Sequence, residues 1–182
     1  MKLLSVLLLC FSSATAEEFN TLNTQQSSVT FVSKQMGVPV AGSFKKFSAD
    51  IAVNPAKPET GSARISIDLN SMDAGSAEAN DELGSRSWFD TKQHPVARFV
   101  SSQVTRTGDD RYEALGNMTI KGKTLSVKAP FTLKRVAGVV VIDGIFPIKR
   151  LDYGIGTGIW ADTSVVADEV KITFHFTVGK PH

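Results

Sequence analysis

The sequence predicts an all-β domain, an antiparallel barrel of eight strands with one short helix between strands. Apolar and polar residues alternate strictly over several segments, which is typical of strands with one face toward an interior and one toward water. Turn residues separate these segments at short intervals, which favours antiparallel hairpins over parallel strands joined by helices. One segment breaks the pattern and has the composition of a helix.

The N-terminal residues precede this domain. Met1-Lys2 is a short positive region, residues 3–11 are apolar, and Ala14-Thr15-Ala16 is an A-x-A cleavage pattern. The apolar run is too short to span a bilayer. We therefore interpret residues 1–16 as a signal peptide and residues 17–182 as the domain, which favours a secreted protein of the bacterial periplasm.

Two alternatives apply to the N-terminal segment. It could be a buried strand, or Cys10 could carry a lipid anchor. The anchor is disfavoured because Leu9, which precedes Cys10, is not small. Cleavage after Ala16 leaves no cysteine, so stability is expected to come from burial and strand pairing without a disulfide.

The strands are predicted in chain order from the alternation. The clearest segments are 29–31, 47–53, 63–69, 125–133 and 170–178, and weaker ones are 96–105, 111–120 and 137–146. Turn signals that separate them include Asn54-Pro55, Gly108-Asp109-Asp110, Lys121-Gly122-Lys123 and Ala137-Gly138. A closed barrel removes sheet edges and can hold one small ligand. A two-sheet sandwich gives the same alternation and remains the alternative.

A short helix is predicted over residues 76–83, with Ser76 as its N-cap and Gly84 at its end. Trp88 and Phe89 follow directly. These two aromatic residues predict a lid or plug over one end of the barrel. The alternative is a surface helix that is tethered by an aromatic residue of the core.

Composition and motifs exclude several kinds of chemistry. The net charge is +2, and acidic and basic residues are interspersed without a long block of either sign. No nucleic-acid partner is therefore expected. Gly154, Gly156 and Gly158 do not have dinucleotide-loop spacing and precede no predicted helix, so they indicate a bend. His94, His175 and His182 lack metal-ligand spacing, and there is no G-x-S-x-G motif. We expect no metal, no cofactor and no enzymatic activity.

Several motifs, taken together and in order, resemble the YceI-like family of exported bacterial proteins. They are Ser28-Val-Thr-Phe31, Gly42-Ser-Phe44, Trp88-Phe89-Asp90, His94-Pro-Val-Ala-Arg-Phe99, Gly116-Asn-Met-Thr-Ile-Lys-Gly122, Lys149-Arg150-Leu-Asp152-Tyr-Gly154 and Asp168-Glu-Val170. The resemblance covers residues 18–178. It implies a lipocalin-like barrel that holds a polyisoprenoid chain, such as the tail of an isoprenoid quinone, and it implies a periplasmic location. Many members carry histidines where this chain has Ser27 and Gln35.

The predicted function is therefore binding, transport or storage of an isoprenoid lipid in an apolar barrel. The predicted ligand-binding residues are Phe31, Phe44, Trp88, Phe89, Phe99, Phe131, Arg150, Asp152, Trp160, Phe174 and Phe176. Arg150 and Asp152 could instead form an ion pair that fixes the glycine-rich bend.

Two other functions remain open from the sequence. One is an interaction module, a filled barrel that docks a membrane redox protein or an envelope partner. The other is an enzyme for a lipid head group, which requires titratable groups that converge at the cavity mouth. Transient contact with a membrane and a homodimer are further expectations.

Overall fold

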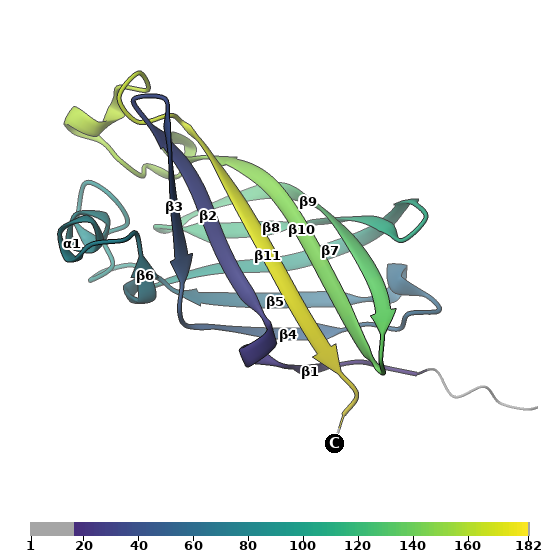
Figure 1. Cartoon of the computed structure of the whole chain (residues 1–182). Helices are drawn as coiled ribbons and strands as arrows, with labels where there is room; N and C mark the ends of the chain where they lie inside the picture. The colour runs from purple at the N-terminus through teal and green to yellow at the C-terminus, as the bar shows by residue number, and fades with distance from the viewer. Residues whose placement is uncertain (1–16, 182) are drawn as a thin grey trace, which may run out of the picture.

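One antiparallel sheet curls on itself and builds most of the domain (Figure 1). The computed structural model describes residues 17–181. Eleven strands form this sheet in the order β4-β5-β7-β8-β9-β10-β11-β2-β3-β6, and β1 pairs with β11 off this path. The predicted all-β class and antiparallel, barrel-like architecture are confirmed, with the curl of a half-barrel. The predicted signal peptide, residues 1–16, lies outside the described residues.

The strands are longer and more numerous than the alternation predicted. They are β1 (Thr21–Leu22), β2 (Ser28–Gln35), β3 (Val38–Phe44), β4 (Phe47–Ala52), β5 (Ser62–Asp68), β6 (Met72–Asp73), β7 (Val96–Gly108), β8 (Arg111–Ile120), β9 (Lys123–Val136), β10 (Val139–Lys149) and β11 (Glu169–Gly179). The 3-10 helices are η1 (Thr24–Gln26), η2 (Pro58–Thr60), η3 (Leu69–Ser71), η4 (Arg150–Tyr153) and η5 (Gly158–Ala161). The predicted count of eight strands was too low, because β3 and the two-residue strands β1 and β6 were missed.

Strand β3 was missed because its turn has no typical turn sequence. Gln35 pairs with Val38, and the two residues between them, Met36 and Gly37, have φ values of 50° and 81°. Both therefore occupy the left-handed region, as a two-residue hairpin turn of type I′ requires. Asn, Asp or Gly is the usual first residue of such a turn, and Met36 hides the signal.

The predicted helix is confirmed as α1 (Ala77–Gly84). The Ser76 side chain accepts a hydrogen bond from the N–H of Ala79 at 3.2 Å, as expected for an N-cap. No described helix is long and apolar enough to cross a membrane.

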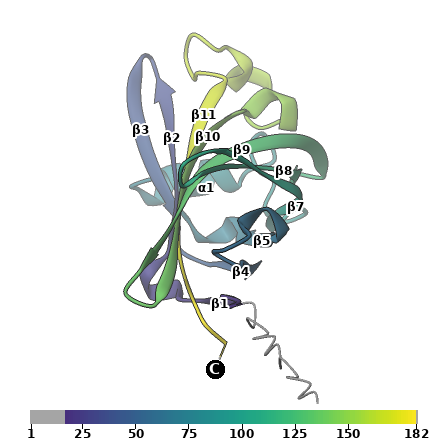
Figure 2. The same cartoon turned by 90° about the vertical axis from the view of Figure 1, so that its right-hand side faces the viewer.

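The first and last described strands, β1 and β11, pair at one end of the barrel (Figure 2). Strand β11 pairs with β2 on one side, where Ile172 lies opposite Phe31. No ladder joins β3 to β4 among the described strands, although they are consecutive in the chain. The N-terminal segment helps to close this seam, since Phe19 exchanges two backbone hydrogen bonds with Val53 at 2.9 and 3.0 Å.

The buried core forms two clusters. The first contains Phe19, Val53, Phe176 and Val178 and lies where the chain ends meet. The second surrounds Trp88 and Tyr153 and lies beside the glycine-rich bend. Phe131 and Phe174 pack against these clusters but are only partly buried. Incomplete burial of inward-facing rings indicates that the barrel is hollow between the clusters.

Candidate functional site

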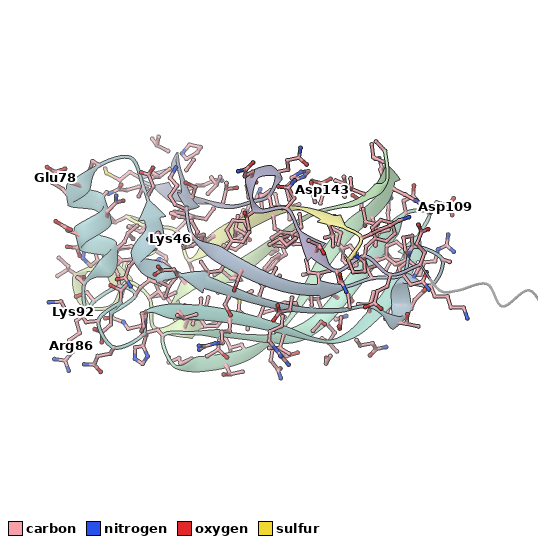
Figure 3. The ribbon with its side chains drawn as sticks, turned by 90° about the horizontal axis from the view of Figure 1, so that it is seen from below. Lys46, Glu78, Arg86, Lys92, Asp109 and Asp143 are labelled. Carbon is pink, nitrogen blue, oxygen red and sulfur yellow. The ribbon has the colours of Figure 1, made fainter. Side chains whose placement is uncertain are left out.

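A cavity of about 420 Å³ occupies the interior of the barrel. Its lining comes from strands β2–β5 and β7–β11 and from helix α1, and most of the lining side chains are apolar. Small-molecule sites typically measure about 300–1,000 Å³ and are lined in the same way. Figure 3 shows the charged side chains of Glu78, Arg86 and Asp109 at the outside of the domain.

Ten of the eleven predicted ligand-binding residues line this cavity. They are Phe31, Phe44, Trp88, Phe89, Phe99, Phe131, Arg150, Trp160, Phe174 and Phe176. Asp152 is the exception, because it lies outside the lining and its side chain is exposed to solvent. Ligand contact by the ten remains a prediction, and the position of Asp152 does not support a ligand contact.

The sequence-based selection missed the aliphatic part of the lining. It includes Ile51, Ile65, Ile67, Val104, Met118, Ile120, Leu133, Ile142, Ile148 and Ile172. Their signal was present, because most of them occupy the inward positions of the alternating segments. Of the residues at those inward positions, the prediction of ligand-binding residues included only the aromatic ones.

Three glycines on the inner face hold phenyl rings of neighbouring strands against the wall. Gly42 lies opposite Phe31 in the ladder, and Gly144 lies opposite Phe174. A Cβ atom at either glycine would collide with the ring of its partner, and a Cβ at Gly116 would collide with the ring of Phe99. Without side chains, these glycines let the rings lie flat over the sheet. The rings thus cover the wall without filling the centre of the barrel.

The glycine-rich segment after β10 is a bend, as predicted. It consists of η4 and η5 and leads into β11, with no α-helix at which a phosphate could bind. Gly154 and Gly156 both have a φ of 71°, which a residue with a side chain rarely adopts. Gly156 also lies directly against the Arg150 guanidinium and the Trp88 ring.

Arg150 holds this bend together from inside. Its side chain is 1% exposed. Its guanidinium donates five hydrogen bonds of 2.7–3.1 Å, all to backbone carbonyls: those of Ile155, Gly156, Trp160, Val166 and Ala167. An arginine side chain has five N–H donors, so every donor is used. A ligand in the cavity therefore meets the charge of Arg150 through space, not through a hydrogen bond.

The hypothesis of an ion pair between Arg150 and Asp152 was wrong. The Arg150 donors turn toward carbonyls of the bend, and the carboxylate that approaches η4 is Asp168, whose side chain accepts the N–H of Leu151 at 3.0 Å. Burial lowers the pKa of the Arg150 guanidinium, and the negative charge of Asp168 partly opposes this shift.

The segment after α1 packs Trp88 into the core, and both the plug and the tethered surface helix that the sequence allowed fit this arrangement. Trp88 is 8% exposed and lines the cavity. The Arg150 Cζ atom and the Trp160 ring centroid each lie 5.6 Å from the Trp88 ring centroid. The carbonyl of Ser87 accepts the N–H groups of Gly156 and Thr157, both at 2.9 Å. The Trp88 segment and the bend therefore form one unit.

Tyr153 lies in this unit with its hydroxyl buried and without a hydrogen-bond partner. Burial, assisted by the negative charge of Asp152, raises its pKa to about 12. A tyrosine in an unfolded chain ionises near about pH 10. The stabilising contribution of the neutral phenol is therefore complete below pH 10 and is lost as the pH rises toward 12.

We expect Tyr153→Phe to remove this pH dependence. The wild-type protein should lose stability between about pH 10 and pH 12 more steeply than the variant, because only the wild type must keep a neutral phenol buried. Urea unfolding midpoints measured across this range compare the two. Parallel curves of midpoint against pH would show that burial does not raise the pKa of Tyr153.

The cavity offers little for acid–base chemistry. The ionisable residues in its lining are Glu82, Arg98 and Arg150, of which the first two are exposed and the third is fully hydrogen-bonded. Within residues 17–181, no group of three or more His, Cys, Asp or Glu side chains could hold a metal ion. The His175–Asp143 pair, with 2.6 Å between Nδ1 and Oδ1, lies outside the cavity lining.

A curled antiparallel barrel around an apolar cavity defines a protein of the lipocalin-like class, which encloses apolar ligands. The model of the YceI-like domain matches residues 21–178. The chain therefore belongs to the YceI-like family.

Solved structures agree with this assignment. BcnA of Burkholderia cenocepacia superposes with a TM-score of 0.84 at 46% identity, over 86% of this chain and 98% of that one. A polyisoprenoid binding domain from Saccharophagus degradans superposes with a TM-score of 0.70 at 18% identity, over 92% and 100% of the two chains. At that identity the second match shows the fold alone.

Curated relatives match over a shorter segment. A UPF0312 protein of Pectobacterium atrosepticum is 33% identical over 105 residues, which are 57% of this chain and 54% of the relative. A UPF0312 protein of Azotobacter vinelandii is 29% identical over 104 residues, again 54% of its length. The chain thus aligns with about half the length of the curated relatives.

Proposed function

We propose that this protein binds an isoprenoid lipid in its barrel and carries or stores it in the periplasm without transforming it chemically. The observation that carries the proposal is the cavity of about 420 Å³, whose lining is almost wholly aliphatic and aromatic. The Saccharophagus degradans domain, which has the same fold and is described as polyisoprenoid binding, supports this choice of ligand.

The energetics of apolar burial fit a branched hydrocarbon chain. Each CH₂ group removed from water contributes about 0.8 kcal/mol, so one five-carbon isoprene unit contributes up to about 4 kcal/mol. Two or three buried units can therefore supply a high affinity with few polar contacts. Affinity should depend mainly on how many units the cavity accepts.

The proposed location rests on the N-terminal sequence. Residues 1–16 carry a positive start, an apolar run and the Ala14-Thr15-Ala16 pattern. Support for a domain that starts at Glu17 comes from its ion pair of 2.7 Å with Arg135 and from the full burial of Phe19. Cleavage after Ala16 would leave every one of these contacts intact.

The hollow barrel disfavours the alternative of a filled interaction module. That function requires an interior packed by its own side chains, together with an exposed aromatic patch. The large hydrophobic residues exposed on the described part of the chain are Met36, Val38, Val100, Leu125, Val136, Ile145 and Ile159, none of which is aromatic.

Native mass spectrometry of the full chain, purified from its own host without detergent, tests the proposal. We expect a bound species whose mass and fragmentation identify an isoprenoid, and an N-terminus at Glu17. Protein without a ligand, or with a mixture of phospholipids and fatty acids that isoprenoid quinone does not displace, would contradict isoprenoid binding. An uncleaved N-terminus in the periplasmic fraction would contradict the proposed processing.

A further inference from the structure

Three exposed aliphatic side chains lie at one end of the barrel. Met36 lies in the β2–β3 turn and is 77% exposed, Val38 begins β3 and is 63% exposed, and Ile159 of η5 is 85% exposed. The turn and the η4–η5 segment both lie at the top of Figures 1 and 2. Backbone hydrogen bonds join the hairpin to the loop between η5 and β11, from Met36 N to Val165 O at 2.8 Å and from Ala167 N to Lys34 O at 2.9 Å. We call these three residues the apolar tip.

The apolar tip adjoins the cavity. Gln35, which precedes Met36, is exposed and lines the cavity, and Trp160, which follows Ile159, lines it from the other side. Trp160 is partly buried, whereas Glu82 of α1 lines the cavity and is exposed to solvent like Gln35. Gln35 and Glu82 therefore mark one place where the cavity lining reaches the surface, between the β2–β3 hairpin and α1, beside the tip.

The turn does not itself require an apolar residue. Met36 has a φ of 50°, in the left-handed region where Asn, Asp and Gly are favoured. A methionine at this position is unfavourable for the turn and unfavourable in water. Burial of Met36 in an apolar environment outside the protein would offset both the strain of the turn and the exposure to water.

The tip is poorly suited to pair with another strand or with a charged surface. Beyond its pairing with β2, strand β3 pairs with β6 only at Ser43 and Phe44, and its free part contains Pro39, which has no N–H to donate. Lys34 and Asp162, which flank the tip, are exposed and carry opposite charges. A neutral aliphatic tip matches the hydrocarbon of a lipid bilayer.

We propose that the apolar tip inserts into the surface of a lipid bilayer and thereby opens the cavity mouth toward the membrane. This inference rests on the proposed function, because an isoprenoid ligand resides in the membrane before it is bound. The tip places the entrance where the ligand can enter the cavity without crossing water.

Flotation of the protein with phosphatidylcholine vesicles tests the inference. The combined variant Met36→Asp and Ile159→Asp should bind vesicles at least about tenfold more weakly, because two exposed side chains that enter hydrocarbon are replaced by charges. Aspartate is tolerated at left-handed φ, so the hairpin turn should remain folded. Binding should change little with salt, because it does not depend on net charge.

A matched control carries the same change at other exposed aliphatic residues. Val136, in the β9–β10 turn at the opposite end of the barrel, is 52% exposed, and Ile145 of β10 is 54% exposed. The combined variant Val136→Asp and Ile145→Asp should bind vesicles as the wild type does. A fluorophore on Ile159→Cys should shift to shorter wavelength with vesicles, and one on Val136→Cys should not; the chain processed after Ala16 has no other cysteine.

The outcomes separate the two proposals when binding of an isoprenoid quinone in detergent micelles is measured in parallel. Membrane insertion of the apolar tip is contradicted if wild-type protein binds the quinone but does not float, or if the tip variant floats equally well. Either result leaves the proposed function intact. Protein that floats but does not bind the quinone overturns the proposed function alone. A dimer that dissociates in the tip variant, with unchanged flotation, assigns the tip to a second copy of the chain.

Discussion

Replacing Arg150 by methionine is expected to destabilise the protein by at least about 3 kcal/mol, because a buried group that leaves unsatisfied partners costs about 1–3 kcal/mol for each one. Five backbone carbonyls receive their hydrogen bonds from this guanidinium. Water can reach some of them after the substitution, so the costs do not add in full. Urea unfolding measures the loss as a lower midpoint at constant slope.

Two further substitutions sharpen this prediction. Arg150→Lys keeps the charge but supplies only three donors without the planar fork, so it should recover a minor part of the stability. Arg64→Met serves as the matched control, because Arg64 is exposed on β5 and should change stability by less than about 0.5 kcal/mol. Equal losses for Arg150→Met and Arg64→Met would show that the carbonyls do not depend on the guanidinium.

Replacing Ala114 by phenylalanine is expected to weaken isoprenoid binding by at least about a hundredfold. Ala114 is 8% exposed and lines the cavity from β8, between Val104 and Ala129 of the neighbouring strands. A phenyl ring there takes space that one isoprene unit would use, and that unit contributes up to about 4 kcal/mol. Titration with isoprenoid quinones of increasing chain length measures the loss.

Leu115→Phe is the control for this variant. Leu115 is the next residue of β8 and does not line the cavity, so the same ring should point away from the ligand. Overpacking can cost about 1–3 kcal/mol in stability, which thermal unfolding of both variants would reveal separately from binding. Unchanged quinone affinity in Ala114→Phe would locate the ligand elsewhere than in the barrel.

Much of the fold could be predicted because alternation reports which way a side chain faces. The segment from Ala63 to Leu69 alternates cleanly and forms β5. Strand β3 could not be predicted, because Met36 conceals a turn whose geometry is set by φ and not by residue type. The number of strands therefore remained uncertain where a turn lacked its usual residues.

Alternation along a strand was sufficient to predict which side chains of the candidate site point inward. It could not predict which residues lie opposite each other in neighbouring strands. Phe31 and Phe174 could be assigned to the interior from alternation, but the glycines beneath their rings become visible only when the strands are paired. Gly144 does occupy an inward position between Ile142 and Phe146, and that is the signal that could have identified it. The partners of Arg150 lie 5–17 residues away in an irregular segment, which no periodicity describes.

The pairing of β2 with β11 determines when the cavity can exist. Phe31 lies opposite Ile172, so strands from the two ends of the chain complete the wall together. Contacts between residues so distant in sequence form late and slowly, because a long loop must close first. The N-terminal part of the chain must therefore wait, without a closed cavity wall, until β11 has been synthesised. The export that we propose would therefore be complete before the cavity forms, if the chain crosses the membrane unfolded.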